Sequence, residues 1–380
     1  MMPQKKNRSF TILPANPLPL FLLAFAIACL APAPYARAAD AFDALTAAAS
    51  GKDAPPAPEP ERPATAAAAP TPLSAGRDLV FYVWSDSHFG AYDFSDPLRL
   101  TIMDRMNALT GRSYPYPYAG DRVAKPAFLL SCGDITENGA PDSWDAPELG
   151  AQRSYVRTIQ RLAPGVGTYE ALGNHDSRKD ANIRGRVAEK QGGTYYSFDK
   201  QGVHFAVLDP YPANNTAAPD FDEAQLAWLK ADLDALPADT PIILAAHVQP
   251  DSEQTALDRT SKPGRASSQA LYEAVKGRNV LAFLHGHLHR TGRLNWRGID
   301  VVEPAGFAYP MPNYQASRDA VFGVVRIQDD RITVFSYDWN LDGFSSSPVL
   351  LDKTFRVPAE ARPAPALYSY SIPPDRANIY

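Results

Sequence analysis

The chain has 380 residues, enough for one large domain or two ordinary ones. Hydrophobic residues make up 45% and charged residues 21%, which is typical of a globular enzyme. The formal net charge is −5 at pH 7, and an acidic surface does not attract DNA, RNA or anionic membranes over long distances. No nucleic acid is therefore expected among the partners.

The first 39 residues have the pattern of an export signal. Basic residues at positions 5–8 precede an apolar run at residues 18–30, and residues 36–38 (Ala-Arg-Ala) fit a small-x-small cleavage site. We predict a signal peptide over residues 1–39, a periplasmic or secreted protein, and no transmembrane span in the mature form. Two alternatives stay open. One is a retained transmembrane helix, for which the apolar run is short; the other is a lipid anchor at Cys29, which follows Ala-Ile-Ala.

Removal of this segment would change the charge and the cysteine content. It deletes four basic residues and no acidic one, which leaves 33 basic against 42 acidic side chains and a charge of −9. Cys132 would be the remaining cysteine, so the mature chain has no intramolecular disulfide. Because Cys132 ends an apolar run, we predict a core residue and not a nucleophile.

Composition divides the mature chain into three parts. Residues 40–76 are rich in alanine and proline and cannot bury enough apolar area to fold, so a disordered linker is predicted there. Residues 358–380 are again rich in proline and form a predicted C-terminal tail. A single folded domain, which would carry the chemistry, is predicted at residues 77–357.

Within this domain, apolar runs typical of buried strands alternate with segments of helical periodicity. Strands are predicted at residues 79–84, 127–132, 168–172, 194–199, 203–209, 241–246, 280–284, 299–302, 321–327 and 332–337. Helices are predicted at residues 97–109, 155–162, 221–236 and 267–275. Such alternation implies an α/β fold in which helices cover the sheets.

Histidine, aspartate and asparagine gather in five short motifs, each directly after a predicted strand. The motifs are Asp86-Ser87-His88, Gly133-Asp134, Gly173-Asn174-His175-Asp176, His247 and His285-Gly286-His287-Leu288-His289. Ligand sites in alternating α/β folds lie at the C-terminal ends of strands, so we expect the motifs to meet at one edge. Nitrogen and oxygen ligands gathered in this way are what a hydrolytic site with two metal ions needs.

Taken together, the motifs resemble those of the calcineurin-like metallophosphoesterase family, over roughly residues 78–337. The resemblance implies a four-layer αββα sandwich of two mixed β-sheets flanked by helices. It also implies two divalent metal ions, which could be Mn, Zn, Fe or Co, with Asp134 bridging them. One ion would be held by Asp86, His88, Asp134 and His289, and the other by Asp134, Asn174, His247 and His287.

The resemblance assigns catalytic roles to two further residues. His175 would stand beside the phosphate as a general acid or hydrogen-bond donor, and Asp176 would hold its ring in the needed tautomer. Glu137 would be a supporting residue near Asp134. The purple acid phosphatases have an iron-binding tyrosine at this position, so a tyrosinate–iron centre is not expected.

The function implied is hydrolysis of a small-molecule phosphodiester by direct attack of a metal-bridging hydroxide. The motifs are nearer to those of the phosphodiesterase branch of the family than to those of the protein phosphatases. Three alternatives stay open: a phosphomonoesterase with the same site, a metal-dependent amidase or nuclease, and a family member that binds metal without catalysis.

Three other features allow more than one interpretation. His285 lies two residues before a predicted ligand and is expected to pack or to support the site. His204 is expected to be a strand residue without a catalytic role. The Tyr-Pro repeat at residues 114–118 is either a rigid surface loop or a substrate-facing rim.

Overall fold

The computed structural model describes residues 76–91, 96–137, 150–177, 181–211, 219–250, 265–305 and 320–357. The predicted signal peptide at residues 1–39, the linker at residues 40–76 apart from its last residue, and the tail at residues 358–380 lie outside this part of the chain. None of the helices among the described residues is long and apolar enough to cross a membrane.

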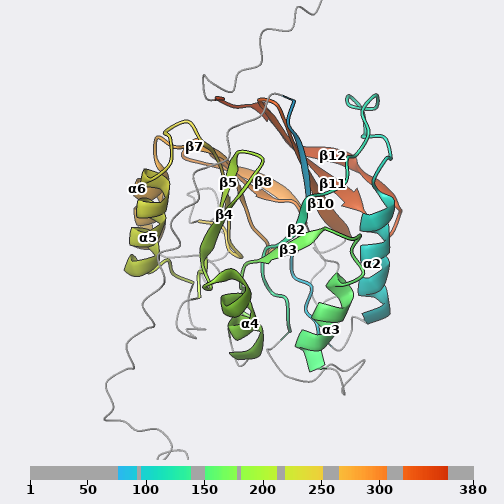
Figure 1. Ribbon diagram of the computed structural model, residues 1–380, viewed down its shortest axis with the longest axis horizontal. Coiled ribbons are helices and arrows are strands. Elements are labelled where there is room, and N and C mark those ends of the chain that lie inside the picture. The colour runs from blue at the N-terminus through green and yellow to red at the C-terminus, as the bar shows by residue number, and fades with distance from the viewer. Residues whose placement is uncertain are drawn as a thin grey trace, which may run out of the picture. The chain divides into compact units, whose positions relative to one another are not determined.

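The first sheet has six strands in the order β12-β11-β10-β1-β2-β3 (Figure 1). Its strands are β1 (Asp78–Trp84), β2 (Phe128–Ser131), β3 (Gly167–Glu170), β10 (Val321–Gln328), β11 (Arg331–Asp338) and β12 (Gly343–Thr354). β1, β2 and β3 are parallel, whereas β10, β11 and β12 add antiparallel pairs on the other side of β1. The sheet is therefore mixed.

The second sheet also has six strands, in the order β4-β5-β6-β7-β9-β8. Its strands are β4 (Tyr196–Lys200), β5 (Val203–Val207), β6 (Pro241–Ala245), β7 (Asn279–Leu284), β8 (Gly292–Trp296) and β9 (Ile299–Glu303). β5, β6, β7 and β9 run parallel, and the two edge strands β4 and β8 are antiparallel to their neighbours.

The two sheets pack face to face, and the alternation of side chains along each strand explains the layers. In β1, Phe81 and Val83 belong to the core between the sheets, where they meet residues of β5 and β6 such as Phe205 and Ile243. Successive side chains of a strand point to opposite faces, so Tyr82 faces outwards, into a second core beneath the helices. β1 is therefore buried on both faces, as its continuous apolar run predicts.

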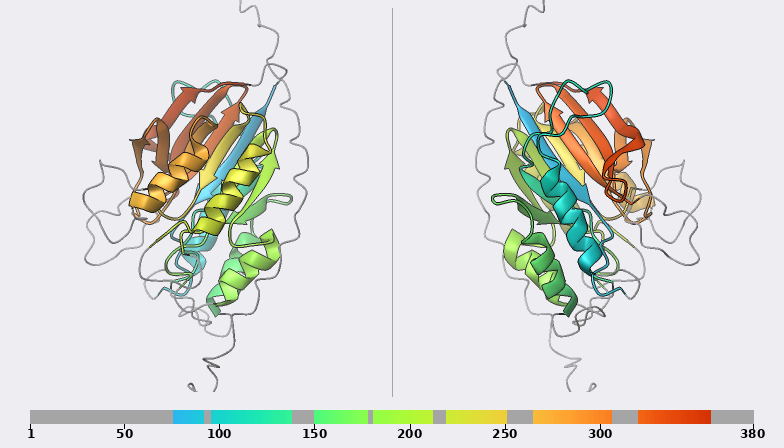
Figure 2. Two further views of the ribbon diagram at one scale, coloured as in Figure 1. Left: turned by 90° about the vertical axis from the view of Figure 1, so that its left-hand side faces the viewer. Right: turned by 90° about the vertical axis from the view of Figure 1, so that its right-hand side faces the viewer.

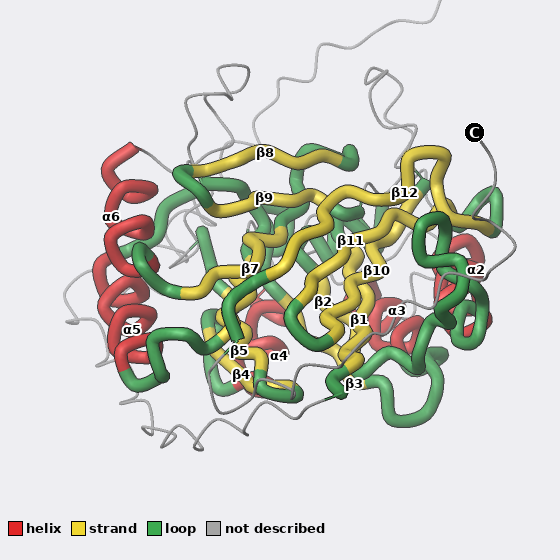
Figure 3. The backbone as a smooth tube through the Cα atoms, turned by 90° about the horizontal axis from the view of Figure 1, so that it is seen from above, coloured by secondary structure: helices red, strands yellow, loops and turns green. Residues whose placement is uncertain are grey.

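Helices cover the outer faces of both sheets (Figures 2 and 3). α2 (Asp96–Ala108) and α3 (Gly150–Ile159) pack against the first sheet, and α5 (Glu223–Asp234) and α6 (Arg265–Val275) pack against the second. The layers are thus helix, sheet, sheet and helix. The predicted αββα sandwich of two mixed sheets is confirmed.

Three elements were not predicted. α4 (Ala181–Gln191) is polar over most of its length and carries Gly185 in its interior, which weakens the helical pattern. β8 and β12 are edge strands. β8 alternates between partly buried and exposed positions, and β12 contains a run of three serines followed by a proline. The polar positions of these two strands make their sequences look like loops.

Candidate metal centre

Each predicted metal ligand lies just beyond the C-terminal end of a parallel strand. Asp86 and His88 follow β1, Asp134 follows β2, Asn174 follows β3, His247 follows β6, and His287 and His289 follow β7. The carboxylates and the amide therefore come from the first sheet, together with one histidine. The other three histidines come from the second sheet, so the site closes one end of the sandwich.

Backbone hydrogen bonds join the loops that carry these residues. Asp86 N donates to Gly133 O over 2.9 Å, and His88 N donates to Asp134 O over 3.0 Å, so the loops after β1 and β2 continue the pairing of their strands. In the second sheet, Gly286 N donates to His247 O over 3.0 Å. The ligand positions are therefore held by main chain as well as by side chains.

Five of the seven predicted ligands have a left-handed backbone. Their φ angles are 58° for Asp86, 41° for His88, 48° for Asp134, 75° for His287 and 54° for His289. Aspartate and histidine adopt this region more readily than most residues, but it is still sparsely populated. Strain of about 1–3 kcal/mol per residue persists only where the surroundings impose it, and such residues gather at functional sites.

The first group of candidate ligands is Asp86, His88 and His289. Nε2 of His289 lies 3.3 Å from Oδ1 of Asp86 and 3.3 Å from Nε2 of His88. Asp86 and His88 are almost completely buried. The three side chains thus converge with their donor atoms facing a common point, as the predicted first metal position requires.

The second group is Asp134, His247 and His287, with Asn174 beside it. Nε2 of His247 lies 3.1 Å from Oδ2 of Asp134, 3.2 Å from Nδ1 of His287 and 3.2 Å from Oδ1 of Asn174. Oδ2 of Asp134 is also 3.9 Å from Nε2 of His88 in the first group. Asp134 therefore stands between the two groups, where the sequence places the bridging ligand.

The donor set fits divalent cations. Imidazole nitrogens and carboxylate oxygens suit zinc, manganese, iron and cobalt. Nδ1 of His247 lies 2.8 Å from the Cys132 carbonyl oxygen, to which it donates, so Nε2 presents its lone pair to the site. Facing ring nitrogens 3.2–3.3 Å apart repel unless a proton or a cation lies between them. The site is therefore built to hold positive charge.

The titration of the buried groups leads to the same conclusion. Burial alone would raise the pKa of Asp134, but the positive charges of His247 and His175 hold it well below its usual value. Burial would lower the pKa of His247, but Asp134 and Asp86 raise that pKa to about 9. Burial and the charge of His247 lower the pKa of His287 to about 4. Without a cation, a proton on His247 offsets part of the negative charge of Asp86 and Asp134, and a bound metal ion would displace it.

His175 reaches the site, but its ring is not held by Asp176. Nδ1 of His175 contacts the backbone carbonyl oxygen of Glu137, and Nε2 lies 3.9 Å from Oδ2 of Asp134. The Glu137 carboxylate lies 2.8 Å from Nδ1 of His88, so Glu137 touches a predicted ligand and the predicted acid. These three residues form a further group with converging donor atoms.

The prediction that Asp176 orients the His175 ring is therefore wrong. Asp176 is buried and accepts hydrogen bonds from Ile135 N at 3.1 Å, Thr136 N at 2.8 Å and Gly173 N at 3.0 Å, as well as from the Thr136 hydroxyl. It thus ties the loop after β2 to the loop after β3. A carboxylate next to the histidine in sequence was the natural candidate, but the tight turn points it back into the protein.

The other residues singled out in the sequence, His285, His204 and Cys132, belong to none of the three groups of candidate ligands. His285 is buried, and its Nδ1 contacts Gly286 O, which agrees with a packing role. His204 lies in β5, where its ring contacts Asp199 and Asp232. Cys132 is a buried free thiol, and burial raises its pKa far above the usual range.

The segment at residues 114–118 is not a rim of the site. The Tyr114 ring stacks on Phe335 with centroids 4.9 Å apart, and Arg326 lies over the same ring. Arg326 pairs with Val80, six residues before Asp86 and towards the opposite end of β1. Of the two interpretations, the surface loop is the one that agrees with the structure.

Two residues that bind the backbone of the ligand loops were not predicted from the sequence. Arg99 of α2 is fully buried, donates to the carbonyl oxygens of Ser87 and His88, and lies 4.5 Å from the Phe89 ring. Glu303 at the end of β9 is also buried and binds the loop that carries His287 and His289. Neither residue belongs to a motif, and a lone charged residue in a helix or strand is usually exposed, so the sequence contains no signal for them.

Comparison with known proteins places this geometry in a family. Residues 79–291, more than half of the chain, match the family model of the calcineurin-like phosphoesterases. A probable cyclic nucleotide phosphodiesterase of Rhodococcus erythropolis is 27% identical over 222 residues, which cover 55% of this chain and 69% of that protein. A cAMP/cGMP dual specificity phosphodiesterase of Mycobacterium tuberculosis is 27% identical over 192 residues, covering 49% of this chain and 55% of that protein.

A relative outside the phosphodiesterases is purple acid phosphatase 23 of Arabidopsis thaliana. It is 29% identical over 200 residues, which cover 48% of this chain and 40% of the phosphatase. Residues 79–291, which match the family model, include all five motifs up to His289, and the groups of candidate ligands lie in these motifs. The chain belongs to the calcineurin-like phosphoesterase family, whose members are metal-dependent phosphoester hydrolases.

Proposed function

We propose that this protein is an exported phosphodiesterase that uses two divalent metal ions and forms no phosphoenzyme. One observation carries the proposal. Asp134 stands between two groups of nitrogen and oxygen donors, with Oδ2 at 3.1 Å from His247 Nε2 and 3.9 Å from His88 Nε2. A carboxylate shared in this way is what two neighbouring cations need in order to be held together.

The chain's own residues would perform distinct tasks. Asp86, His88 and His289 would hold one cation, Asn174, His247 and His287 the other, and Asp134 both. When bound, the cations would supply Lewis acidity for water and for the phosphoryl oxygens. His175 reaches the edge of the site with Nε2 free of the Glu137 contact, so a proton on this nitrogen could pass to the leaving oxygen.

The choice of a diester as substrate rests on the relatives and the motifs. The two relatives named above as phosphodiesterases act on cyclic nucleotides according to their names, so a small phosphodiester is the substrate class we assign. A phosphomonoester is the second candidate, because purple acid phosphatase 23 is 29% identical over 200 residues, which cover 48% of this chain. A family member that binds metal without catalysis remains the third.

The proposed location rests on the sequence alone. Residues 1–39 have the order of a signal peptide, and the mature chain would carry a charge of −9. A periplasmic or secreted enzyme with an acidic surface would meet small phosphoesters and would bind no nucleic acid. Fractionation of cells that express the full chain, with N-terminal sequencing of the product, tests the cleavage and separates it from lipidation at Cys29.

Metal removal and add-back test the enzymatic proposal. The protein is stripped with a chelator, Mn²⁺, Zn²⁺, Fe²⁺ or Co²⁺ is returned, and turnover of bis-p-nitrophenyl phosphate is compared with that of p-nitrophenyl phosphate. We expect activity that returns with about two metal ions per chain and favours the diester. Asn174→Ala and His247→Ala should each abolish most of it, whereas His204→Gln, a histidine outside the site, should not.

Each outcome separates the candidates. Preference for the monoester would make the protein a phosphatase with the same centre. No turnover of any phosphoester, with two metal ions bound, would favour the non-catalytic alternative. Near-normal turnover in Asn174→Ala or His247→Ala would reject the proposed site.

A further inference from the structure

The loop after β7 carries one candidate ligand for each metal position in an unusual backbone conformation. His287 and His289 have φ angles of 75° and 54°, both in the left-handed region. Their rings reach the ligand groups, whereas the side chain of Leu288 between them lines a cavity elsewhere. Within the loop, Leu288 N donates to Gly286 O at 2.9 Å, but the loop forms no regular structure, so its amides also need partners outside it.

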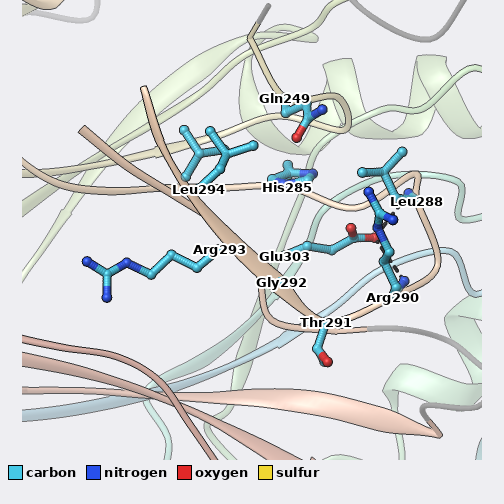
Figure 4. Close-up of a pocket in the computed structure, with 10 residues that line it drawn as sticks. Gln249, His285, Leu288, Arg290, Thr291, Gly292, Arg293, Leu294 and Glu303 are labelled. Carbon is cyan, nitrogen blue, oxygen red and sulfur yellow. Dashed lines mark hydrogen bonds between the residues drawn. The ribbon is translucent and has the colours of Figure 1, made fainter. Parts of the chain in front are cut away.

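Two buried carboxylates provide these partners. Asp86 accepts from His287 N at 3.0 Å with Oδ2, in addition to its place in the first ligand group. Glu303 accepts from Leu288 N at 3.0 Å and from Arg290 N at 3.3 Å, both with the same oxygen, Oε1. Figure 4 shows the Glu303 carboxylate pointing to the backbone of these two residues. The amides on both sides of His289 are thus held by Glu303.

The surroundings of Glu303 give the loop room to move if this contact is lost. A cavity of about 380 Å³ lies beside the loop, lined among others by Gln249, His285, Leu288 and Glu303. Glu303 is 1% exposed and His285 is 3% exposed. Packing alone does not fill this side of the loop, so the hydrogen bonds of Glu303 must fix its position.

We propose that Glu303 is a positioning residue that holds the His287-Leu288-His289 loop in the conformation able to bind both metal ions. Glu303 touches no candidate donor atom itself and acts through the backbone of Leu288 and Arg290. This inference rests on the proposed two-metal function, because the loop contributes a ligand to each position. It predicts that loss of the acceptor oxygen weakens both metal sites without removing any ligand.

The test compares Glu303→Gln with Glu303→Leu in the full chain. Glutamine keeps an oxygen at the position of Oε1, whereas leucine has a similar size and no acceptor. Co²⁺ is the probe: titration of the stripped protein gives the dissociation constants, and the visible absorption spectrum reports the coordination geometry. We expect Glu303→Leu to bind Co²⁺ about 10- to 100-fold more weakly with an altered spectrum, and Glu303→Gln to bind it nearly as wild type does.

Asp300→Leu is the matched control. Asp300 is another buried carboxylate of β9, and it pairs with Arg293 at 2.7 Å and with Lys353 at 2.5 Å, away from the loop. Its replacement should lower the unfolding temperature and leave Co²⁺ binding unchanged, which separates positioning from general stability. If Glu303→Leu does not fold, Glu303→Asp is the second variant, because its carboxylate is one methylene too short to reach both amides.

The outcomes distinguish a failure of the proposed two-metal function from a failure of the proposed role of Glu303. Wild-type protein that binds no Co²⁺ would overturn the proposed function and this inference with it. Wild-type protein that binds two Co²⁺ ions, together with a folded Glu303→Leu or Glu303→Asp of equal affinity and spectrum, would overturn the role of Glu303 alone. Equal weakening in Asp300→Leu would do the same, because the effect would then be one of stability.

Discussion

Backbone carbonyl oxygens, and not carboxylates, set the ring orientation of two histidines in the site. Nδ1 of His247 donates to Cys132 O, and Nδ1 of His175 contacts Glu137 O. In both rings Nε2 is thereby left for the site. The same hydrogen bond to a backbone carbonyl would serve a ligand in one case and a proton donor in the other, because His247 is buried between Asp134 and Asn174 whereas His175 is partly open to solvent.

His175→Ala should separate proton donation from metal binding. We expect kcat to fall by about 10²- to 10⁴-fold, the usual contribution of a general acid, while two metal ions remain bound. The loss should be larger for a diester with an alkyl leaving group than for bis-p-nitrophenyl phosphate, because p-nitrophenolate leaves without a proton. Loss of one metal ion would instead make His175 a ligand, together with His88 and Glu137.

Asp176→Asn should act on stability more than on proton transfer. Each oxygen of Asp176 accepts two hydrogen bonds, so an amide nitrogen at either position leaves buried donors without an acceptor. A buried donor left unpaired costs about 1–3 kcal/mol, and we expect the free energy of unfolding to fall by about 2–4 kcal/mol. Urea unfolding in the presence of a chelator measures it without the contribution of metal.

The control for this variant is Asp104→Asn, an exposed carboxylate that pairs with Arg161. Its replacement should change the unfolding free energy by less than about 1 kcal/mol. An Asp176→Asn protein of unchanged stability in which only the basic limb of the pH–rate profile has shifted would restore the orienting role that the sequence suggested.

For single residues, the sequence predicts which residues form the site better than it predicts which partners their side chains contact. The seven predicted ligands meet at one place because each follows a strand, and the positions of the strands along the sequence can be read from apolar runs. The partner of the His175 ring could not be read in the same way, because it depends on how two loops turn after their strands. Arg99 and Glu303 could not be found at all, since burial of a single charge depends on tertiary packing.

At the scale of elements, small residues let the ligand loops of the two sheets approach each other. A Cβ on Gly286 would lie 2.7 Å from Oδ2 of Asp86 and still closer to the Ser85 hydroxyl. A Cβ on Gly133, whose φ is 95°, would lie 2.7 Å from Nδ1 of His247. Gly133 and Gly286 are therefore required by close contact between loops that belong to different sheets.

Gly286→Ala should consequently damage the metal centre from the second sheet. The added methyl group forces Ser85 and Asp86 apart from the loop, which we expect to cost about 1–3 kcal/mol of stability and to weaken Co²⁺ binding. Gly292→Ala is the control in the same segment, since a Cβ there meets no atom within 4 Å. Equal Co²⁺ affinity in the two variants would show that the loops can separate without loss of the site.

Secondary structure was predicted best where apolar residues form a regular pattern. β1 and β6 are continuous apolar runs, and α2 and α5 carry apolar residues at helical spacing; each of the four was placed within a few residues of its bounds. β8 and β12 were missed because exposed polar positions interrupt their apolar patterns, whereas the edge strands β3 and β4 were predicted.

At the scale of the whole molecule, the site exists only where the two sheets are packed together. The first sheet brings the carboxylates, the amide and His88, and the second brings His247, His287 and His289. Asp134 and His247, at 3.1 Å, and Asp86 and His289, at 3.3 Å, connect the two sheets. Metal binding should therefore stabilise the packed sandwich as a unit. The order of the motifs along the sequence, through the family resemblance, already implies this arrangement.

A histidine outside the site gives the stability of the sandwich its own pH dependence. The His204 ring in β5 lies between Asp199 of β4, at 3.0 Å, and Asp232 of α5, at 2.9 Å. Burial would lower the pKa of His204, but the hydrogen bonds and charges of the two aspartates outweigh it and raise the pKa to about 9. The protonated ring therefore joins the second sheet to its covering helix.

The sign of the pH effect follows from the raised pKa. An unfolded histidine titrates near pH 6.5, so the stabilisation is fully present below that value and is lost as the pH rises towards about 9. The shift corresponds to a contribution on the order of 3 kcal/mol at most. We expect the difference in unfolding free energy between wild type and His204→Gln to shrink between about pH 6.5 and pH 9. Chelator-treated protein keeps metal binding out of the comparison, and a difference that stays constant with pH would mean that His204 is neutral in the folded protein.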